Sequence, residues 1–529
     1  MVSSSSRAPM TTDDASTDGA PSTRFGSPFS RWVTLVLGVV VALLFAIPLE
    51  PRPPGQRVRE LERPVDSTVR YFERDLELRD AVRTMPAWQQ HVVLLVLGGS
   101  TDLADAVTAY RDVISATGHG SANAPSLAPA DTPSAERTLD APDRAATDAG
   151  TSETKIVDLR ARLAILLEES SRSDEARDVL AALDADGHGA VASAVRAAYG
   201  ETPAESASGR GATELGSLAP GWARDRALAS FARRSGDEAM VSELAHASAS
   251  RADRWRPTAL LIALLFLVPS AIGIVLFSIW LWKDRPRVVL AHAEIPPRWS
   301  WDDGCAVLVR AAFAGFMVAG ALFAIARETG APAIAAWLEL VASLPMMWWI
   351  RRALLAPNAS DFATAFGLVP ARQAHGIARS IGVWFAFVLG LLAIDQFGAA
   401  AIGIACQRLG GEPHWTEMIQ ESFMWSPMPV ALLGAVDGSV WAPLFEEIGC
   451  RGLLYMTLRT RVGPWSAAFA SAILFAIPHG YSIPGFVSVA WTGFVFALAV
   501  EQCGSLVPGM ICHASWNAVL LASNFALYR

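Results

Sequence analysis

Charged residues and cysteines are scarce in this 529-residue chain. Only 18% of the residues are charged, and the net charge is -8. This balance argues against nucleic-acid partners, which favour basic surfaces. The 5 cysteines lie in or beside apolar segments and the long polar region has none, so no disulfide framework is predicted there. The cysteines also lack the paired short spacing of a zinc site. The whole chain is 52% hydrophobic, which indicates a multi-pass membrane protein with some soluble sequence attached.

Long apolar runs predict an all-α transmembrane bundle of about nine spans, since a spanning helix needs ~20 apolar residues. The first run is predicted to be an uncleaved anchor, because no small-residue cleavage site follows it. The runs are Trp32–Pro48, Thr258–Trp282, Ala306–Ala326, Ala331–Ile350, Ile381–Cys406, Met428–Leu458 (interrupted), Pro464–Pro478, Pro484–Val500 and Leu506–Leu527.

The polar stretches divide the chain into parts. The N-terminal tail is rich in Ser, Thr and Pro and is predicted to be disordered. Between the first two spans lies an Ala-rich region with helical periodicity, which we interpret as a separable module. The predicted parts are a tail over 1–31, an anchor over 32–48, a soluble helical region over 50–255 with a linker at about 118–154, and a multi-span membrane domain over 257–529.

Basic residues predict the orientation of the chain. The positive-inside rule places short loops rich in Lys and Arg in the cytoplasm. Residues 50–255 are then extracytoplasmic, and we expect the cell (inner) membrane. The basic residues that flank the spans are Arg24, Arg31, Lys283, Arg285, Arg287, Arg351 and Arg352.

Glu446 and Glu447 stand side by side in one of the most apolar stretches. A charge at bilayer depth costs at least ~2.5–3.5 kcal/mol, so such residues are interpreted as functional. Arg451 follows Glu447 by four residues on the same helical face and is expected to pair with it. Glu446 points about 100° away, so one carboxylate is neutralised and the other is available for chemistry.

Two further pairs have helical spacing, namely Phe475 with His479 and His513 with Asn517. Lipid offers polar groups no partners, so these side chains are expected to meet the glutamates. If the first two elements form a helical hairpin, Glu446 and His479 lie at the same end. His513 lies nearer the opposite surface by simple counting, and a tilt or unwinding at Pro508-Gly509 would have to bring it back.

This set of residues suggests hydrolysis. A desolvated carboxylate can act as a general base, so Glu446 with His479 could hold and deprotonate a water molecule. His513 and Asn517 could donate hydrogen bonds to a developing oxyanion. Cys450 lies four residues after Glu446 but lacks a base nearby in sequence, so we interpret it as a packing residue.

These elements resemble the CPBP family of intramembrane proteases, also called the CAAX prenyl protease 2 or Abi family. The family's pattern is E-E-x-x-x-R, then F-x-x-x-H, then H-x-x-x-N, and all three match in order over about residues 440–520. The resemblance implies that Glu446 and His479 activate water and that His513 and Asn517 form the oxyanion hole. Glu447 and Arg451 would support the site.

The resemblance leaves the cofactor open, because the family is called both a metalloprotease and a glutamic protease. The site's two histidines and two glutamates are residue types that can ligate zinc. If a metal is bound, the expected ligands are Glu446, His479 and His513. No H-E-x-x-H spacing is present, so we predict no obligatory metal. The implied partners are a peptide or membrane-protein substrate and the lipid bilayer. The partner of residues 50–255 is not indicated.

Two alternatives remain from the sequence. A family member can be a non-proteolytic membrane partner or an immunity-type protein. The intramembrane or interfacial acids Asp395 and Asp437 also allow a carboxylate-lined proton or ion transporter. No repeated pair of broken helices in two halves supports the transporter.

Overall fold

The computed structural model describes most of the chain. The described residues are 24–46, 64–97, 103–118, 141–200, 210–283, 288–329, 338–371, 377–411, 413–418 and 421–528. Within these ranges the chain is helical and contains no strand, which confirms the all-α prediction. Residues 1–23 of the predicted tail lie outside the described residues.

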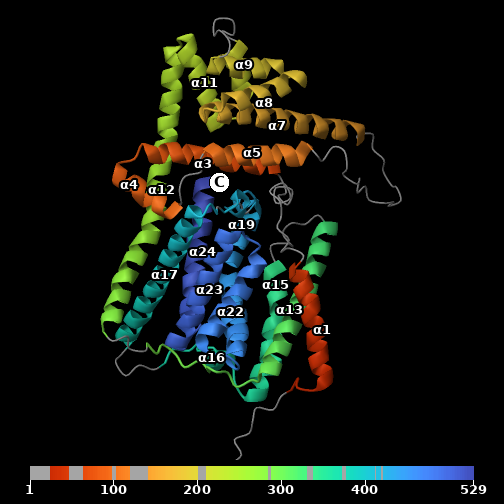
Figure 1. Cartoon of the computed structure of the whole chain (residues 1–529), viewed down its shortest axis with the longest axis vertical. Coiled ribbons are helices and arrows are strands. Elements are labelled where there is room, and N and C mark those ends of the chain that lie inside the picture. Colours follow the sequence, from red (N-terminus) through yellow and green to blue (C-terminus); the bar gives the residue numbers. More distant parts are fainter. Residues whose placement is uncertain are drawn as a thin grey trace, which may run out of the picture.

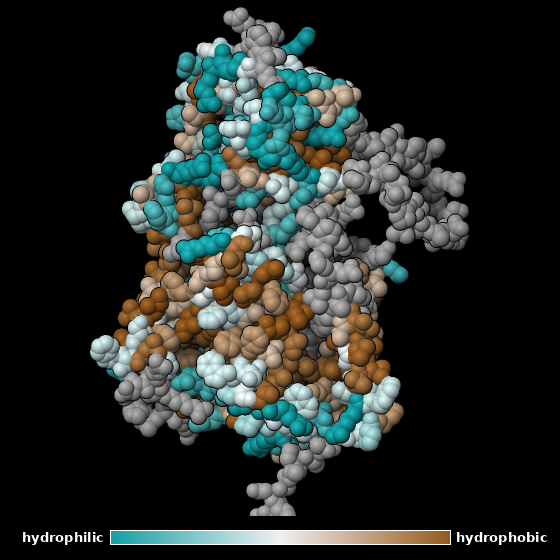
Figure 2. Space-filling model, in the orientation of Figure 1, coloured by the Kyte–Doolittle hydropathy of each residue, from teal (hydrophilic) through white to brown (hydrophobic). Residues whose placement is uncertain are grey.

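Among the described residues, six helical segments are long and apolar enough to cross a membrane. Together they form a hydrophobic band between two hydrophilic ends (Figure 2). The segments are α12 (Glu238–Trp282), α13 (Trp301–Thr329), α17 (Ile377–Arg408), the continuous stack Met428–Arg459, α23 (Ile483–Cys503) and α24 (Val507–Tyr528).

Three other expected spans correspond to helices that are not among these six. They are α1 (Pro28–Ala46), α15 (Leu338–Trp349) and α22 (Pro464–Ala476). Part of the predicted run 331–350 lies outside the described residues. The structure therefore supports a multi-pass bundle without fixing the expected number of spans.

The stack that carries the glutamates is an α-helix interrupted by two wider π-helical segments. Segments of this kind occur frequently at functional sites. Its parts are α19 (Met428–Val436), η6 (Asp437–Trp441), α20 (Ala442–Glu446), η7 (Glu447–Tyr455) and α21 (Met456–Arg459). Glu446 and Glu447 lie where α20 passes into the second π segment.

In the part of the chain that the structure describes, eight helices lie outside the hydrophobic band. In Figure 1 the helices α3, α4 and α5 form a layer across the membrane helices, and α7–α11 stack on that layer. Helix α7 begins at Ala141 and so covers the end of the predicted linker, whereas residues 119–140 lie outside the described residues. The helices are α3 (Pro64–Arg83), α4 (Ala87–Leu97), α5 (Leu103–Gly118), α7 (Ala141–Glu169), α8 (Ser173–Ala185), α9 (Gly189–Tyr199), α10 (Arg210–Ser217) and α11 (Trp222–Ser235).

Helix α12 joins the extramembrane helices to the bundle without a break (Figure 1). Asp237 caps its first turn by accepting a hydrogen bond from Met240 N. The helix then passes through Pro257 and Pro269 and ends at Trp282. At 1.5 Å per residue, its 45 residues extend over about 68 Å.

The extramembrane helices share their core with the membrane helices. Phe72 and Tyr110 belong to the same hydrophobic cluster as Phe423 and Leu521. The ring of Tyr71 stacks on the ring of Tyr528, with centroids 4.8 Å apart. The region expected to be a separable module is therefore packed onto the end of α24.

Short elements close the two ends of the bundle. Facing the extramembrane helices are η5 (Trp415–Met418), α18 (Glu421–Met424) and η8 (Ile477–His479). At the other end, Arg24 Nη1 donates to Arg352 O, and Arg31 pairs with Asp302 at 2.6 Å. That end also holds η3 (Ile350–Leu355), η4 (Ala356–Asn358) and α16 (Phe362–Ala365). Arg24, Arg31 and Arg352 thus lie at the end opposite the extramembrane helices, whereas Arg285 and Arg287 lie outside the described residues. The orientation of the chain in the membrane stays a prediction.

Candidate active site

The two adjacent glutamates have different surroundings. The Glu447 side chain is 1% exposed, and its Oε1 lies 3.1 Å from Nη1 of Arg451. The Glu446 side chain is 38% exposed, and its Oε2 lies 3.8 Å from Nε2 of His513. The expected ion pair is present, and the neighbouring carboxylate is open to an incoming molecule.

Arg451 is buried among aromatic rings. Its guanidinium carbon lies 4.2 Å from the ring centroid of Phe475 and 5.6 Å from that of Phe496. These cation–π contacts stabilise a buried cation without using its N–H donors. Neither Nη1 nor Nη2 has a hydrogen bond of good geometry among the described residues. N–H groups of the Arg451 guanidinium therefore have no hydrogen-bond acceptor among the described residues, although they lie next to the Glu447 carboxylate.

His513 bridges the two glutamates. Its Nδ1 lies 3.2 Å from Oε1 of Glu447, while its Nε2 faces Glu446. The unwinding considered at Pro508-Gly509 does not occur, because α24 is helical from Val507 onward. Gly509 instead allows close approach, since a Cβ there would lie 3.2 Å from Oε2 of Glu447. The missing side chain lets α24 pack against η7.

His479 joins this group through Phe475. Its Nδ1 lies 3.0 Å from the carbonyl oxygen of Phe475, one turn earlier, which fixes the ring. The Phe475 ring is 5.1 Å from the His479 ring and 6.3 Å from the His513 ring, centroid to centroid. Phe475, identified in the sequence only as part of a motif, is the hydrophobic contact that joins three site residues.

Asn517 lies one turn beyond His513 on α24. Its Nδ2 donates to the carbonyl oxygen of Gly438, in the first π segment, at 2.8 Å. The amide thereby ties α24 to η6, and its amide group carries a second N–H. An oxyanion role for this residue stays a prediction.

Some features of the site were not predicted from the sequence. Phe496 carried no motif, and the π-helical turns have no sequence signal that we recognise. Asp395 was noted only as an intramembrane acid. It is 5% exposed and accepts a hydrogen bond from Oγ1 of Thr492 at 2.7 Å.

The donor set does not suit a metal ion in this arrangement. Among the residues that the structure describes, no three His, Cys, Asp or Glu side chains converge as ligands. The trio Glu446, His479 and His513 therefore does not form a ready ligand set, and no step is derived through a metal.

These apolar helices, with a buried carboxylate, arginine and histidine group between them, define an integral membrane protein with a polar intramembrane site. Residues 428–519 match the Rce1-like family, described as type II CAAX prenyl endopeptidase Rce1-like. The match runs from α19 into α24 and includes the motif residues from Glu446 to Asn517. The match supports the assignment of this part of the chain to the CPBP, or CAAX protease, family. No curated protein and no solved structure matches the chain.

Proposed function

We propose that this protein is an intramembrane endopeptidase that hydrolyses peptide bonds with a water molecule activated by Glu446. The observation that carries the proposal is the contrast within the glutamate pair. Glu447 is buried and held by Arg451 and His513, whereas Glu446 is 38% exposed beside the same histidine. A general base must be accessible to water and substrate, and Glu446 meets that requirement.

Water is the only co-reactant that the proposed hydrolysis of a peptide bond requires. Glu446 takes a proton from water, and the hydroxide oxygen attacks the carbonyl carbon of the peptide bond. The tetrahedral intermediate then collapses as the C–N bond breaks, and the proton on Glu446 passes to the departing amine. The products are a carboxylic acid and an amine.

The other site residues would orient and stabilise these groups. His479 is proposed to hold the attacking water with Glu446. His513 and Asn517 are proposed to donate hydrogen bonds to the oxyanion, a contribution worth about 2.7–4 kcal/mol for one donor. Glu447 acts as a positioning residue, because its carboxylate fixes the His513 ring through Nδ1.

The proposed substrate is a peptide segment of a membrane protein. The family description names prenyl endopeptidases, so a farnesylated peptide ending in a CAAX sequence is the first substrate to assay. An unprenylated peptide of the same sequence is its matched control. A preference for the farnesylated peptide would extend the proposal to a lipid-modified substrate.

Replacing Glu446 tests the mechanism. Glu446→Gln keeps the side-chain size and removes the base, so peptide cleavage by purified protein should fall by ~10²–10⁴. Comparing the termini of membrane proteins in cells that carry wild type or Glu446→Gln would then identify natural substrates. Wild-type turnover by a folded Glu446→Gln protein would reject this role.

Cys450 supplies the control for a different nucleophile. It lies one turn after Glu446 in η7. Cys450→Ala should retain cleavage if water is the attacking group. Loss of cleavage in a stable Cys450→Ala protein would point to a thiol mechanism instead.

The buried carboxylate of Asp395 favours a second candidate, a proton or ion path. It lies on α17 in the membrane, hydrogen-bonded to Thr492 on α23. Proteoliposomes separate the two functions. Ion or proton flux that survives Glu446→Gln but is abolished by Asp395→Asn would support transport.

A further inference from the structure

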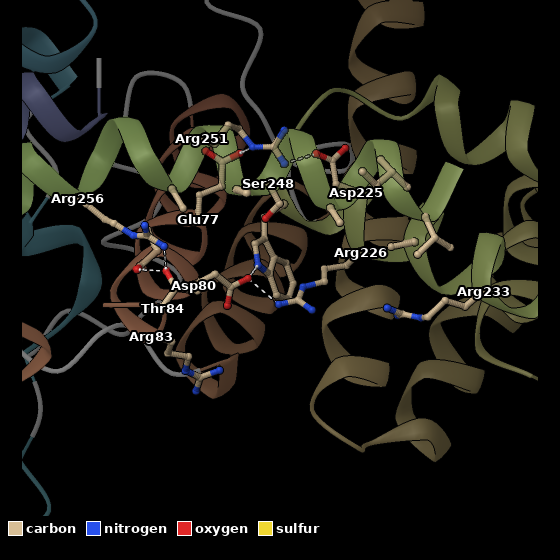
Figure 3. A pocket seen from close by; sticks show the side chains of 18 residues that line it. Glu77, Asp80, Arg83, Thr84, Asp225, Arg226, Arg233, Ser248, Arg251 and Arg256 are labelled. Carbon is tan, nitrogen blue, oxygen red and sulfur yellow. Dashed lines mark hydrogen bonds and ion pairs between the residues drawn. The ribbon is translucent and has the colours of Figure 1, made fainter. Parts of the chain in front are cut away.

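A charged cleft lies outside the membrane, where α3, α11 and α12 meet (Figure 3). Its volume is about 550 Å³, within the range of roughly 300–1,000 Å³ that is usual for ligand sites. The intramembrane site uses none of its residues. No motif in the sequence indicates it, because its charged residues come from three separate helices.

The floor and walls of the cleft are built from small and apolar side chains. Trp222 lines the cleft and is nearly buried, and its Nε1 donates to Oδ2 of Asp80 at 2.6 Å. Small side chains leave room for another backbone to approach closely. The apolar and small lining residues are Ala81, Ala229, Val241, Leu244, Ala245, Ser248, Ala249 and Ala252.

The acidic residues of the cleft are already neutralised. Asp80 pairs with Arg226 at 2.6 Å, and Asp225 pairs with Arg251 at 2.5 Å. Glu77 lies 3.4 Å from Nε of Arg251. Burial raises the pKa of Glu77, and the nearby Arg251 and Arg74 oppose that rise. None of these carboxylates is available to repel an incoming anion strongly.

Two arginines of the lining are uncommitted. Arg83 on α3 and Arg233 on α11 are exposed, and neither has an ion-pair partner within the described part of the chain. In Figure 3 they lie toward opposite sides of the cleft. Guanidinium groups bind carboxylates through paired hydrogen bonds. The lining arginines outnumber the acids by two, which matches a ligand with two negative charges.

We propose that this cleft is a peptide-binding site for a short segment that carries two carboxylates on a small apolar body. The apolar walls fit alanine-like and leucine-like side chains, and Arg83 and Arg233 fit the two acidic groups. Such a segment would belong to a protein on the extramembrane side. The inference is independent of the proposed proteolysis, since none of its contacts involves the intramembrane site.

Peptide binding to the full-length protein tests this site. The protein carries Glu446→Gln, so that a peptide is not cleaved, and is held in a neutral detergent. The probe is a fluorescein-labelled peptide with two glutamates among alanines and leucines, followed by fluorescence anisotropy. A peptide with lysines in place of the glutamates is the control. The acidic peptide should bind, and the basic peptide should not.

Charge reversal locates the binding. The double variant Arg83→Glu with Arg233→Glu should weaken binding at least about tenfold, equivalent to ~1.4 kcal/mol. Arg70→Glu is the matched control, because Arg70 is also exposed on α3 but does not line the cleft. Both proteins should melt at the wild-type temperature, since the replaced side chains are exposed.

Four results would overturn the proposal. The first is that the acidic peptide does not bind, and the second is that the two peptides bind equally well. The third is that Arg70→Glu weakens binding as much as the double variant, which would indicate a general charge effect. The fourth is that glutarate or inorganic phosphate displaces the peptide at the concentrations at which the peptide itself binds, which would indicate a site for small anions.

Discussion

Two buried arginines distinguish the extramembrane helices from the membrane site. Arg162 on α7 is 0% exposed, and Arg451 in η7 is 1% exposed. Both are paired with a glutamate. The two arginines differ in their hydrogen bonds: every guanidinium nitrogen of Arg162 donates one, whereas Nη1 and Nη2 of Arg451 donate none among the described residues. We interpret Arg162 as a structural residue and Arg451 as a residue of the candidate active site.

Each of the three guanidinium nitrogens of Arg162 donates a hydrogen bond. Its Nε donates to Oδ2 of Asp158 at 2.7 Å, while its two terminal nitrogens donate to Glu73 and to the carbonyl oxygen of Ala219. Burial tends to lower the pKa of Arg162, but Glu73, Tyr110 and Asp158 outweigh it and raise the pKa. This network links α3, α7 and the turn before α11, and every nitrogen of the guanidinium donates to an acceptor within it.

Arg451 is held differently. It combines one ion-pair distance with two aromatic contacts, and its terminal nitrogens lack hydrogen bonds among the described residues. Incomplete satisfaction of a buried charge is costly for folding alone. Such a group is therefore expected where a substrate or water completes the bonding.

We expect the largest loss of stability from removing Arg162, whose hydrogen bonds join Glu73, Asp158 and Ala219. Arg162→Ala would leave Glu73 and Asp158 without their partner, and we expect a loss of about 5 kcal/mol, at the upper end of the range for broken buried pairs. Chemical denaturation in detergent would measure it. A wild-type midpoint for Arg162→Ala would show that the network contributes nothing to stability.

Arg451→Ala should destabilise the protein less than Arg162→Ala does, but it should abolish peptide cleavage. Glu447 would still contact His513, so we expect about 3 kcal/mol of lost stability, at the lower end of the same range. Cleavage should be lost even at temperatures where the variant is folded. If Arg451→Ala proves less stable than Arg162→Ala yet remains active, the comparison between the two arginines is wrong.

A smaller effect is expected where the two regions touch. Tyr528 Oη donates to Oδ1 of Asp75 at 3.1 Å, across the boundary between α24 and α3. Tyr528→Phe removes this bond but keeps the stack on Tyr71, so stability should fall by about 1 kcal/mol. A double-mutant cycle with Asp75→Asn would isolate the pair. Zero coupling energy would show that the hydrogen bond does not join the regions.

The smallest effect concerns pH. Because the pKa of Glu77 is raised above 4.5 on folding, its contribution to stability falls as pH rises through and above that value. Glu77→Gln should therefore gain stability relative to wild type as pH increases from 4 to 7. Melting temperatures at several pH values would show this trend, and an opposite slope would contradict it.

Glu175 is a control for Glu77, because its pKa is lowered on folding rather than raised. Hydrogen bonds from Arg172 and Arg111 lower its pKa to about 2, so its contribution is present above its ordinary value of 4.5 and is lost as pH falls. Glu175→Gln should consequently lose stability relative to wild type as pH increases. Equal slopes for the two variants would indicate that neither carboxylate determines the pH dependence.

The sequence predicted the helical class and several contacts of the site. The i,i+4 spacing of Glu447 and Arg451 was sufficient for their pair, because helical geometry is local. Counting residues misplaced His513, since the calculation assumed regular α-helices. In the structure His513 lies beside both glutamates, and the missing side chain of Gly509 leaves room for Glu447 next to α24.

The packing of the extramembrane region could not be predicted in the same way. Its helical periodicity showed which faces are apolar, but not which distant helix covers them. Phe72 lies against Trp415, with ring centroids 5.6 Å apart, and Glu417 accepts a hydrogen bond from Ser482 N at 2.6 Å. These contacts connect α3, through η5, with the turn after His479. Each joins residues that are far apart in the sequence, so sequence periodicity could not predict it.

The shared core also determines when this protein can finish folding. The hydrogen bond between Tyr528 and Asp75 joins residues 453 positions apart, and Phe72 shares its cluster with Leu521. At a synthesis rate of 5–20 residues per second, the N-terminal helices wait roughly 20–90 s for these partners. During that interval they are exposed to chaperones and proteases. A truncation that removes the last turn of α24 would therefore act on the extramembrane region like a mutation in its own core.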